Sequence, residues 1–133
     1  MTGSDAKPMS PSLRKPTDAE LAILSVLWTR GPSTVREVAE SMGRETGYTT
    51  VLKLLQIMTE KRLVTRDESA RTHVYSAAYS QDQTQRHLVS DLLARAFDGS
   101  AAKLVLQALA TGKASPEEID EIRKLLEKHR GAR

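Results

Sequence analysis

Hydrophobic and polar positions near the start of the chain alternate with the period of helices. Thr17 and Glu20 have the spacing of a capping box, in which each side chain bonds the other residue's backbone N–H, and apolar positions at helical spacing follow. The Gly-Pro pair at 31–32 ends this segment. Thr34 and Glu37 repeat the capping signal directly afterwards. The pattern predicts two helices joined by a tight turn.

A third helix is predicted over residues 48–61. Its apolar residues recur at i, i+3, i+4 and i+7, which places them on one face: Val51, Leu54, Leu55 and Met58. That face is expected to pack in the core. The opposite face is polar and is left free for recognition.

After the third helix the hydrophobic period becomes two. Residues 64–66 and 72–75 alternate as the strands of an antiparallel hairpin would, with 67–70 as its tip. A two-stranded hairpin is marginally stable alone, so we expect it to pack on the helices. The apolar side chains available for this are Val64, Val74 and, as a further candidate, Tyr75.

Three more amphipathic helices are predicted after Ser80, the later two opened by Ser100 and by Ser115 before Pro116. They carry more apolar surface than solvent-facing helices need. A homodimer interface explains this surface economically; the alternative is that the helices fold back on the first domain. The residues assigned to dimerisation are Leu92, Phe97, Leu104, Val105, Leu109, Ile119, Ile122, Leu125 and Leu126.

These elements predict a mainly α protein with a small β-hairpin, arranged as a winged helix-turn-helix domain plus a C-terminal helical dimerisation module. The expected divisions are a disordered tail over 1–15, a winged-helix DNA-binding domain over 16–79 and a helical dimerisation region over 80–130. A helix followed by a two-stranded ribbon suits DNA because the major groove, about 12 Å wide, admits one helix while the ribbon reaches the neighbouring backbone.

Composition removes several classes of function. The 133 residues include no cysteine, and the three histidines are far apart, so no metal and no cofactor are predicted. No nucleophile elbow, paired carboxylates or phosphate-binding glycine loop is present, so the chain is not expected to be an enzyme. No apolar run approaches the roughly 20 residues that span a bilayer, and no signal peptide is recognisable. A cytoplasmic protein without membrane insertion is expected.

Charge alone does not identify the partner, because the net charge is only +3. The local arrangement is more informative. Hydroxyl, amide, ammonium and methyl groups that base edges and phosphates accept lie on the open face of the third helix, and a basic cluster follows it. The predicted DNA contacts are Tyr48, Thr49, Thr50, Leu52, Lys53, Lys61, Arg62, Arg66 and Arg71.

Some of these residues have a second interpretation. Tyr48 could approach a phosphate or a thymine methyl, or it could pack beneath the turn. Lys61 and Arg62 could simply favour the C-terminal end of the helix dipole. For the whole domain, the alternative function is a winged-helix protein–protein interaction module without specific DNA binding, which would need neither Lys53 nor Arg71.

An ordered set of motifs from Pro16 to Lys128 resembles the penicillinase-repressor family. The motifs are Pro16–Leu24 with Leu27–Trp28, Thr34–Val38, Tyr48–Val51, Arg71–Tyr75, Phe97–Ser100, Leu104–Leu106 and Ser115–Ile119. The resemblance implies a homodimeric transcriptional repressor that binds a palindromic double-stranded DNA operator. It also implies that Thr49, Thr50 and Lys53 contact DNA from the recognition helix, with Arg66 and Arg71 in the wing.

In that family a sensor metallopeptidase leads to cleavage of the repressor in its dimer region, which releases the operator. This chain has Gln107-Ala108 where the best-known scissile pair is Asn-Phe. The departure argues against induction by cleavage at that bond; a related peptidase that recognises another sequence is the alternative. The copper-responsive branch uses a C-terminal cysteine cluster, which this chain lacks, so copper sensing is disfavoured.

Overall fold

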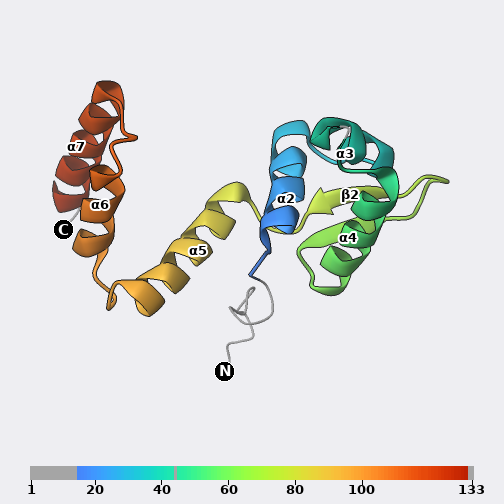
Figure 1. Ribbon diagram of the computed structural model, residues 1–133, viewed down its shortest axis with the longest axis horizontal. Coiled ribbons are helices and arrows are strands. Elements are labelled where there is room, and N and C mark those ends of the chain that lie inside the picture. The colour runs from blue at the N-terminus through green and yellow to red at the C-terminus, as the bar shows by residue number, and fades with distance from the viewer. Residues whose placement is uncertain (1–14, 44, 132–133) are drawn as a thin grey trace. The chain divides into compact units, whose positions relative to one another are not determined.

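The computed structural model describes residues 15–43 and 45–131, and within them the chain forms six helices and one two-stranded antiparallel sheet (Figure 1). The predicted tail lies outside these residues except for Lys15. The mainly α fold with one hairpin is confirmed. The elements are α2 (Asp18–Arg30), α3 (Val35–Met42), α4 (Tyr48–Glu60), β1 (Val64–Asp67), β2 (Val74–Ala77), α5 (Gln81–Ala96), α6 (Ala101–Ala110) and α7 (Pro116–Gly131).

Reciprocal capping boxes start the first two helices, as the spacing predicts. The Thr17 N–H donates to Glu20 Oε1 at 2.9 Å, and the Glu20 N–H donates to Thr17 Oγ1 at 3.2 Å. Thr34 and Glu37 make the same pair of bonds at 2.9 and 3.2 Å. Backbone N–H groups that have no partner inside a helix are thereby satisfied, which fixes where α2 and α3 begin.

One hydrophobic core lies between α2, α3, α4 and the hairpin. Trp28 packs against it, and its Nε1–H donates to the Tyr79 carbonyl at 3.0 Å, which joins α2 to the segment after β2. Trp28 thus has a structural role in this unit. The core residues are Ile23, Leu24, Leu27, Val35, Val38, Val51, Leu55, Met58, Leu63, Val64 and Tyr75.

The end of α4 is a Schellman motif. The Leu63 N–H donates to the Met58 carbonyl at 2.9 Å, and the Arg62 N–H donates to the Thr59 carbonyl at 3.1 Å. Arg62 occupies the left-handed position, with φ of 66°, where glycine is more usual. The motif turns the chain sharply, so that buried Leu63 leads directly into β1.

The hairpin differs from the prediction in its second strand and in the side chain it buries. Val64 pairs with Ala77, and Asp67 pairs with Val74, so the connection spans residues 68–73 rather than 67–70. The Ser69 N–H donates to Asp67 Oδ1 at 2.9 Å, and this local bond starts the connection after Asp67. Alternate residues face opposite sides of a strand. Tyr75, 1% exposed, therefore enters the core, whereas Val74 is only half-buried.

The loop between α2 and α3 adds a third segment to the hairpin. Ser33 and Tyr75 exchange both backbone hydrogen bonds, at 2.9 and 2.8 Å. Ser33 is itself buried, and its Oγ donates to the Gly31 carbonyl at 2.8 Å. Backbone bonds therefore hold the wing to the turn that precedes α3.

The chain divides into two compact units, Met1–Asp91 and Leu92–Arg133. The division falls within α5, whose first turns belong to the first unit and include buried Thr84. In the second unit, the Ser100 hydroxyl accepts the Lys103 N–H and the Ser115 hydroxyl accepts the Glu118 N–H, each at 3.1 Å. The predicted starts of α6 and α7 are thus confirmed.

No helix among the described residues is long and apolar enough to cross a membrane. The same residues contain no group of three or more His, Asp or Glu side chains that could hold a metal ion.

Candidate nucleic-acid interface

The outward face of α4 presents an unbroken row of polar side chains. Thr49, Thr50, Lys53 and Gln56 are all exposed, whereas Val51, Leu55 and Met58 are buried on the other side of the same helix. A rod of 13 residues is about 20 Å long and fits a major groove. The side chains of α4 that were predicted to contact base edges are therefore exposed to solvent.

Two predicted contacts in the first turn of α4, Tyr48 and Leu52, differ in how far they are exposed. Tyr48 is 52% exposed, so it does not pack beneath the turn. Leu52 is half-buried and packs partly against the core, so its DNA contact stays a prediction. The two residues are one helical turn apart, so they border the same side of α4.

Lys61 is used inside the domain. Its ammonium bonds both carboxylate oxygens of Glu20, at 3.0 and 2.9 Å, and Glu20 is 2% exposed. A buried carboxylate without a cation would carry a large desolvation cost, so this pair compensates a charge in the core. Lys61 was predicted as a DNA contact from the basic cluster after the helix. The ion pair with Glu20 could not be foreseen, because Glu20 lies 41 positions away and its burial is not visible in the sequence.

The wing arginines differ in how they are engaged. Arg66 pairs with Glu68 and lies opposite Tyr75 in the sheet. The hydrogen bonds from its guanidinium to the Tyr75 hydroxyl and to Glu68 raise the pKa of Arg66 above its ordinary value. Arg71 is exposed in the 68–73 connection and has no hydrogen-bond or ion-pair partner among the described residues. Arg71 is thus the freer of the two cations.

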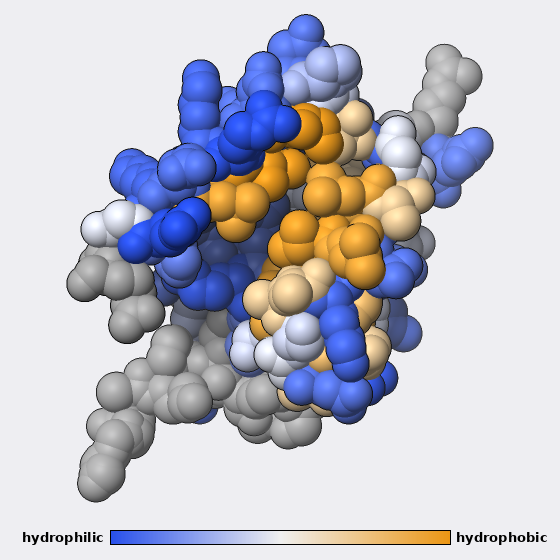
Figure 2. All heavy atoms as spheres, turned by 90° about the vertical axis from the view of Figure 1, so that its left-hand side faces the viewer, coloured by the Kyte–Doolittle hydropathy of each residue, from blue (hydrophilic) through white to orange (hydrophobic). Residues whose placement is uncertain are grey.

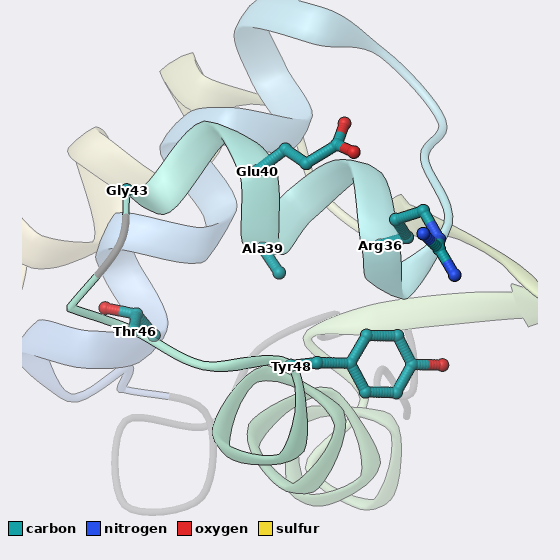
Figure 3. A pocket seen from close by; sticks show the side chains of 6 residues that line it. All are labelled: Arg36, Ala39, Glu40, Gly43, Thr46 and Tyr48. Carbon is teal, nitrogen blue, oxygen red and sulfur yellow. The ribbon is translucent and has the colours of Figure 1, made fainter.

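Arg36 is a further basic residue on the surface beside α4 and the wing, and it was not among the predicted DNA contacts. Arg36, in the first turn of α3, is exposed and lies beside Tyr48 (Figure 3). The Thr-Val-Arg-Glu-Val motif contains it, but its relevance depends on how α3 crosses α4. Arg36 borders a groove together with Tyr48, Leu52, Arg71 and His73. Three elements therefore meet at one cationic groove.

Comparison with known proteins identifies the family. The model of the penicillinase repressor family matches residues 16–128. The chain belongs to the penicillinase repressor family. It is similar to the transcriptional regulator BlaI of Mycobacterium tuberculosis strains CDC 1551 and H37Rv, with 33% identity over 112 residues, which cover 82% of this chain and 80% of the relative. It is also similar to the penicillinase repressor of Bacillus licheniformis, with 24% identity over 116 residues, 86% of this chain and 91% of the relative.

In this penicillinase repressor family member, the residues predicted for dimerisation form no core of their own. Among the described residues of α6 and α7, none is buried. Leu125 and Leu126 are each 61% exposed. Leu92, Val105 and Leu109 are exposed too, while Phe97, Leu104, Ile119 and Ile122 are half-buried.

Hydrophobic side chains gather on the face shown in Figure 2, with hydrophilic residues around them. Leu109, Ile122 and Leu125 line a shallow hollow between α6 and α7. Leu106, 63% exposed, belongs to the same apolar helix but was missing from the predicted set. Every exposed leucine of α6 and α7 is a candidate dimer contact. Helical spacing alone gave no reason to choose among these leucines.

Proposed function

We propose that this chain is a sequence-specific DNA-binding repressor that acts as a homodimer on a palindromic operator. The observation that carries the proposal is the exposed polar face of α4, Thr49, Thr50, Lys53 and Gln56, mounted on a closed hydrophobic core beside a wing. Helix N-terminal residues of this kind read base edges when the helix enters a major groove. Family membership supports repression as the consequence of binding.

The proposed contacts divide by chemistry. Thr50 and its neighbours Thr49 and Lys53 face base edges, and Arg71 contacts the phosphate backbone from the wing. Arg66 takes a lesser part because its guanidinium is already engaged by Glu68. Lys61 is removed from the set because it neutralises Glu20.

The dimer is proposed from the apolar surface of the second unit. Leu106, Leu125 and Leu126 expose more than 60% of their surface, and a second copy can cover them. A two-fold dimer presents two α4 helices to two half-sites of a symmetric operator. Joining the two readers raises the effective concentration of the second after the first has bound.

Derepression then follows from any event that separates the C-terminal units. Cleavage by a sensor metallopeptidase within this unit is one such event. Gln107 and Ala108 lie inside α6, so a cut there would divide the apolar surface on which the dimer depends. Each separated reader would retain its contacts and lose the gain from linkage.

The decisive experiment measures binding of the purified protein to DNA upstream of its own coding region and to unrelated DNA, at low and near-physiological salt. We expect a protected symmetric site occupied by two chains. Weak binding that is equal on both DNAs and abolished by salt would refute specific recognition and favour the protein-interaction alternative.

Two substitutions test the division of contacts on that operator. Thr50→Ala should change sequence preference more than salt dependence. Arg71→Ala should weaken binding to all sequences and reduce the slope of log K against log salt by about one unit. Equal loss on operator and random DNA for Thr50→Ala would contradict its role in base reading.

A further inference from the structure

A groove between α3, α4 and the wing is lined by two arginines, Arg36 and Arg71. The residues that border it come from three separate elements: Thr34–Glu37 from the start of α3, Tyr48 and Leu52 from α4, and Arg71–His73 with Tyr75 from the wing. Its two residues from α4, Tyr48 and Leu52, are the immediate sequence neighbours of exposed Thr49 and Lys53. A strand that lies in it would therefore pass beside the residues proposed to read bases.

The cationic groups of the groove are free and its carboxylate is engaged. Among the described residues, Arg36 and Arg71 have no hydrogen-bond or ion-pair partner. Glu37 caps its own helix through Oε1 and faces Arg30 through Oε2, at 3.7 Å from the guanidinium nitrogen. The charge that the groove offers to a ligand is thus positive.

Figure 3 shows a neighbouring pocket, which shares Arg36 and Tyr48 with this groove. Arg36 from α3 and the Tyr48 ring from α4 extend toward the same side, with the guanidinium close to the ring's hydroxyl end. Glu40, the other carboxylate near Arg36, points away from Tyr48. A guanidinium fork and a phenolic hydroxyl in this arrangement provide donors without a competing acid.

We infer that this groove holds one segment of the DNA sugar–phosphate backbone, with Arg36 as a phosphate-binding residue, Tyr48 as a hydroxyl donor beside it and Arg71 on the wing side. The inference rests on the proposed DNA binding and adds a contact to it. Arg36 contacts this backbone segment from α3 and Arg71 contacts it from the wing, so two elements besides α4 bind the same strand. Such contacts position the reader and carry no sequence information themselves.

The test measures salt-dependent binding of the full-length protein to the footprinted operator and to unrelated DNA, with Arg36→Ala, Arg36→Lys and Tyr48→Phe. Arg36→Ala should weaken binding to both DNAs by about tenfold and lower the salt slope by about one unit. Arg36→Lys should restore the slope because the charge is retained. Tyr48→Phe should lower affinity without changing the slope, since the hydroxyl is neutral.

Lys128→Ala, which removes the same charge from α7, is the matched control and should leave the slope unchanged. The double variant Arg36→Ala with Arg71→Ala should lose about two units, because each guanidinium contacts its own phosphate. Thermal unfolding of each variant confirms that the exposed substitutions leave the fold intact.

The outcomes separate this inference from the function on which it rests. An unchanged slope for Arg36→Ala, with a loss of one unit for Arg71→Ala, would overturn the Arg36 assignment and leave the repressor proposal standing. Absence of any preference for the operator in the wild-type protein would overturn both. If Arg36→Ala left DNA binding intact but abolished binding of an Asp/Glu-rich peptide, the groove would be a protein-docking site and the inference would be wrong.

Discussion

The two units of this chain differ in how completely they bury their apolar side chains. In the first unit, Ile23, Val38, Val51, Leu55 and Met58 are completely buried. In the second, none of the described residues of α6 or α7 is buried, although α6 is mostly apolar. The first unit is complete as a single chain, whereas the second exposes the kind of surface that the first hides. From this contrast we expect the first unit to be stable alone and the second to need another surface.

The difference has a simple physical origin. Three helices and a hairpin enclose an interior, so each apolar face meets another. In contrast, α6 and α7 can cover only the faces that they turn toward each other, and their outward apolar faces are left in water. The proposed dimer would cover these faces with a second copy of α6 and α7.

The largest expected difference between the two units appears when the chain is divided into two fragments. A fragment of residues 1–97 should unfold cooperatively, because it contains the whole core, while a fragment of residues 98–133 should show no cooperative transition at low micromolar concentration. Isolated chains of fewer than about 40 residues seldom fold without association. Circular dichroism against temperature makes the measurement. A cooperative, concentration-independent transition in the short fragment would show that α6 and α7 fold without a partner.

Leu125→Asp attacks the second unit alone. A buried leucine contributes about 1.5–3 kcal/mol, and two-fold symmetry counts it twice, so the dimer should be weakened by about 3–6 kcal/mol. Operator affinity should fall with it, and the unfolding midpoint of the first unit should not move. Sedimentation equilibrium gives the dimer constant. Lys124→Asp, on the polar side of α7, is the control; a Leu125→Asp protein that is still fully dimeric would refute the interface.

Lys61→Ala attacks the first unit through its buried charge. Glu20 would lose its cation, and the free energy of unfolding should fall by about 1–3 kcal/mol, less than for a fully buried pair because the Lys61 side chain is 32% exposed. Denaturant titration measures this change. Adding Glu20→Gln should recover part of the loss. A change in the DNA salt slope with unaltered stability would return Lys61 to the DNA-contact set.

Arg62 provides the smallest and most local test. Arg62→Gly relieves a left-handed conformation but gives the unfolded chain more freedom, so stability should change by no more than about 1 kcal/mol. Arg62→Ala keeps the unfavourable conformation and removes the same charge. If Arg62 contacts a phosphate, both variants should lose about one unit of salt slope. Equal slopes for both variants and the wild type would confine Arg62 to its structural role.

Local features of this fold could be predicted from the sequence. The capping pairs at Thr17, Thr34, Ser80 and Ser100 all form, because each involves residues three positions apart. Gly112 follows α6 in the left-handed conformation, with φ of 74°, and glycine is the residue most common at such a position. Such signals need no knowledge of tertiary contacts.

Features that depend on distant residues could not be predicted in the same way. Lys61 finds Glu20 only after α2 and α4 have packed, and Arg66 meets Tyr75 only in the actual hairpin register. The partial burial of Leu52 could not be predicted either, because it depends on the angle at which α4 packs on the core. Arg36 was missed for a related reason, since the sequence does not show which side of α3 faces Tyr48.

The paired bonds between Ser33 and Tyr75 have a consequence for how this protein can change over generations. Both bonds join backbone atoms, at 2.9 and 2.8 Å, so the wing keeps its attachment whatever side chains occupy its tip. Residues 68–73 are therefore free to vary in length of side chain, charge and hydrogen-bonding capacity while the hairpin holds its place. Later substitutions at the tip can therefore alter its charge, and with it the proposed phosphate contacts, while the backbone attachment of the wing remains.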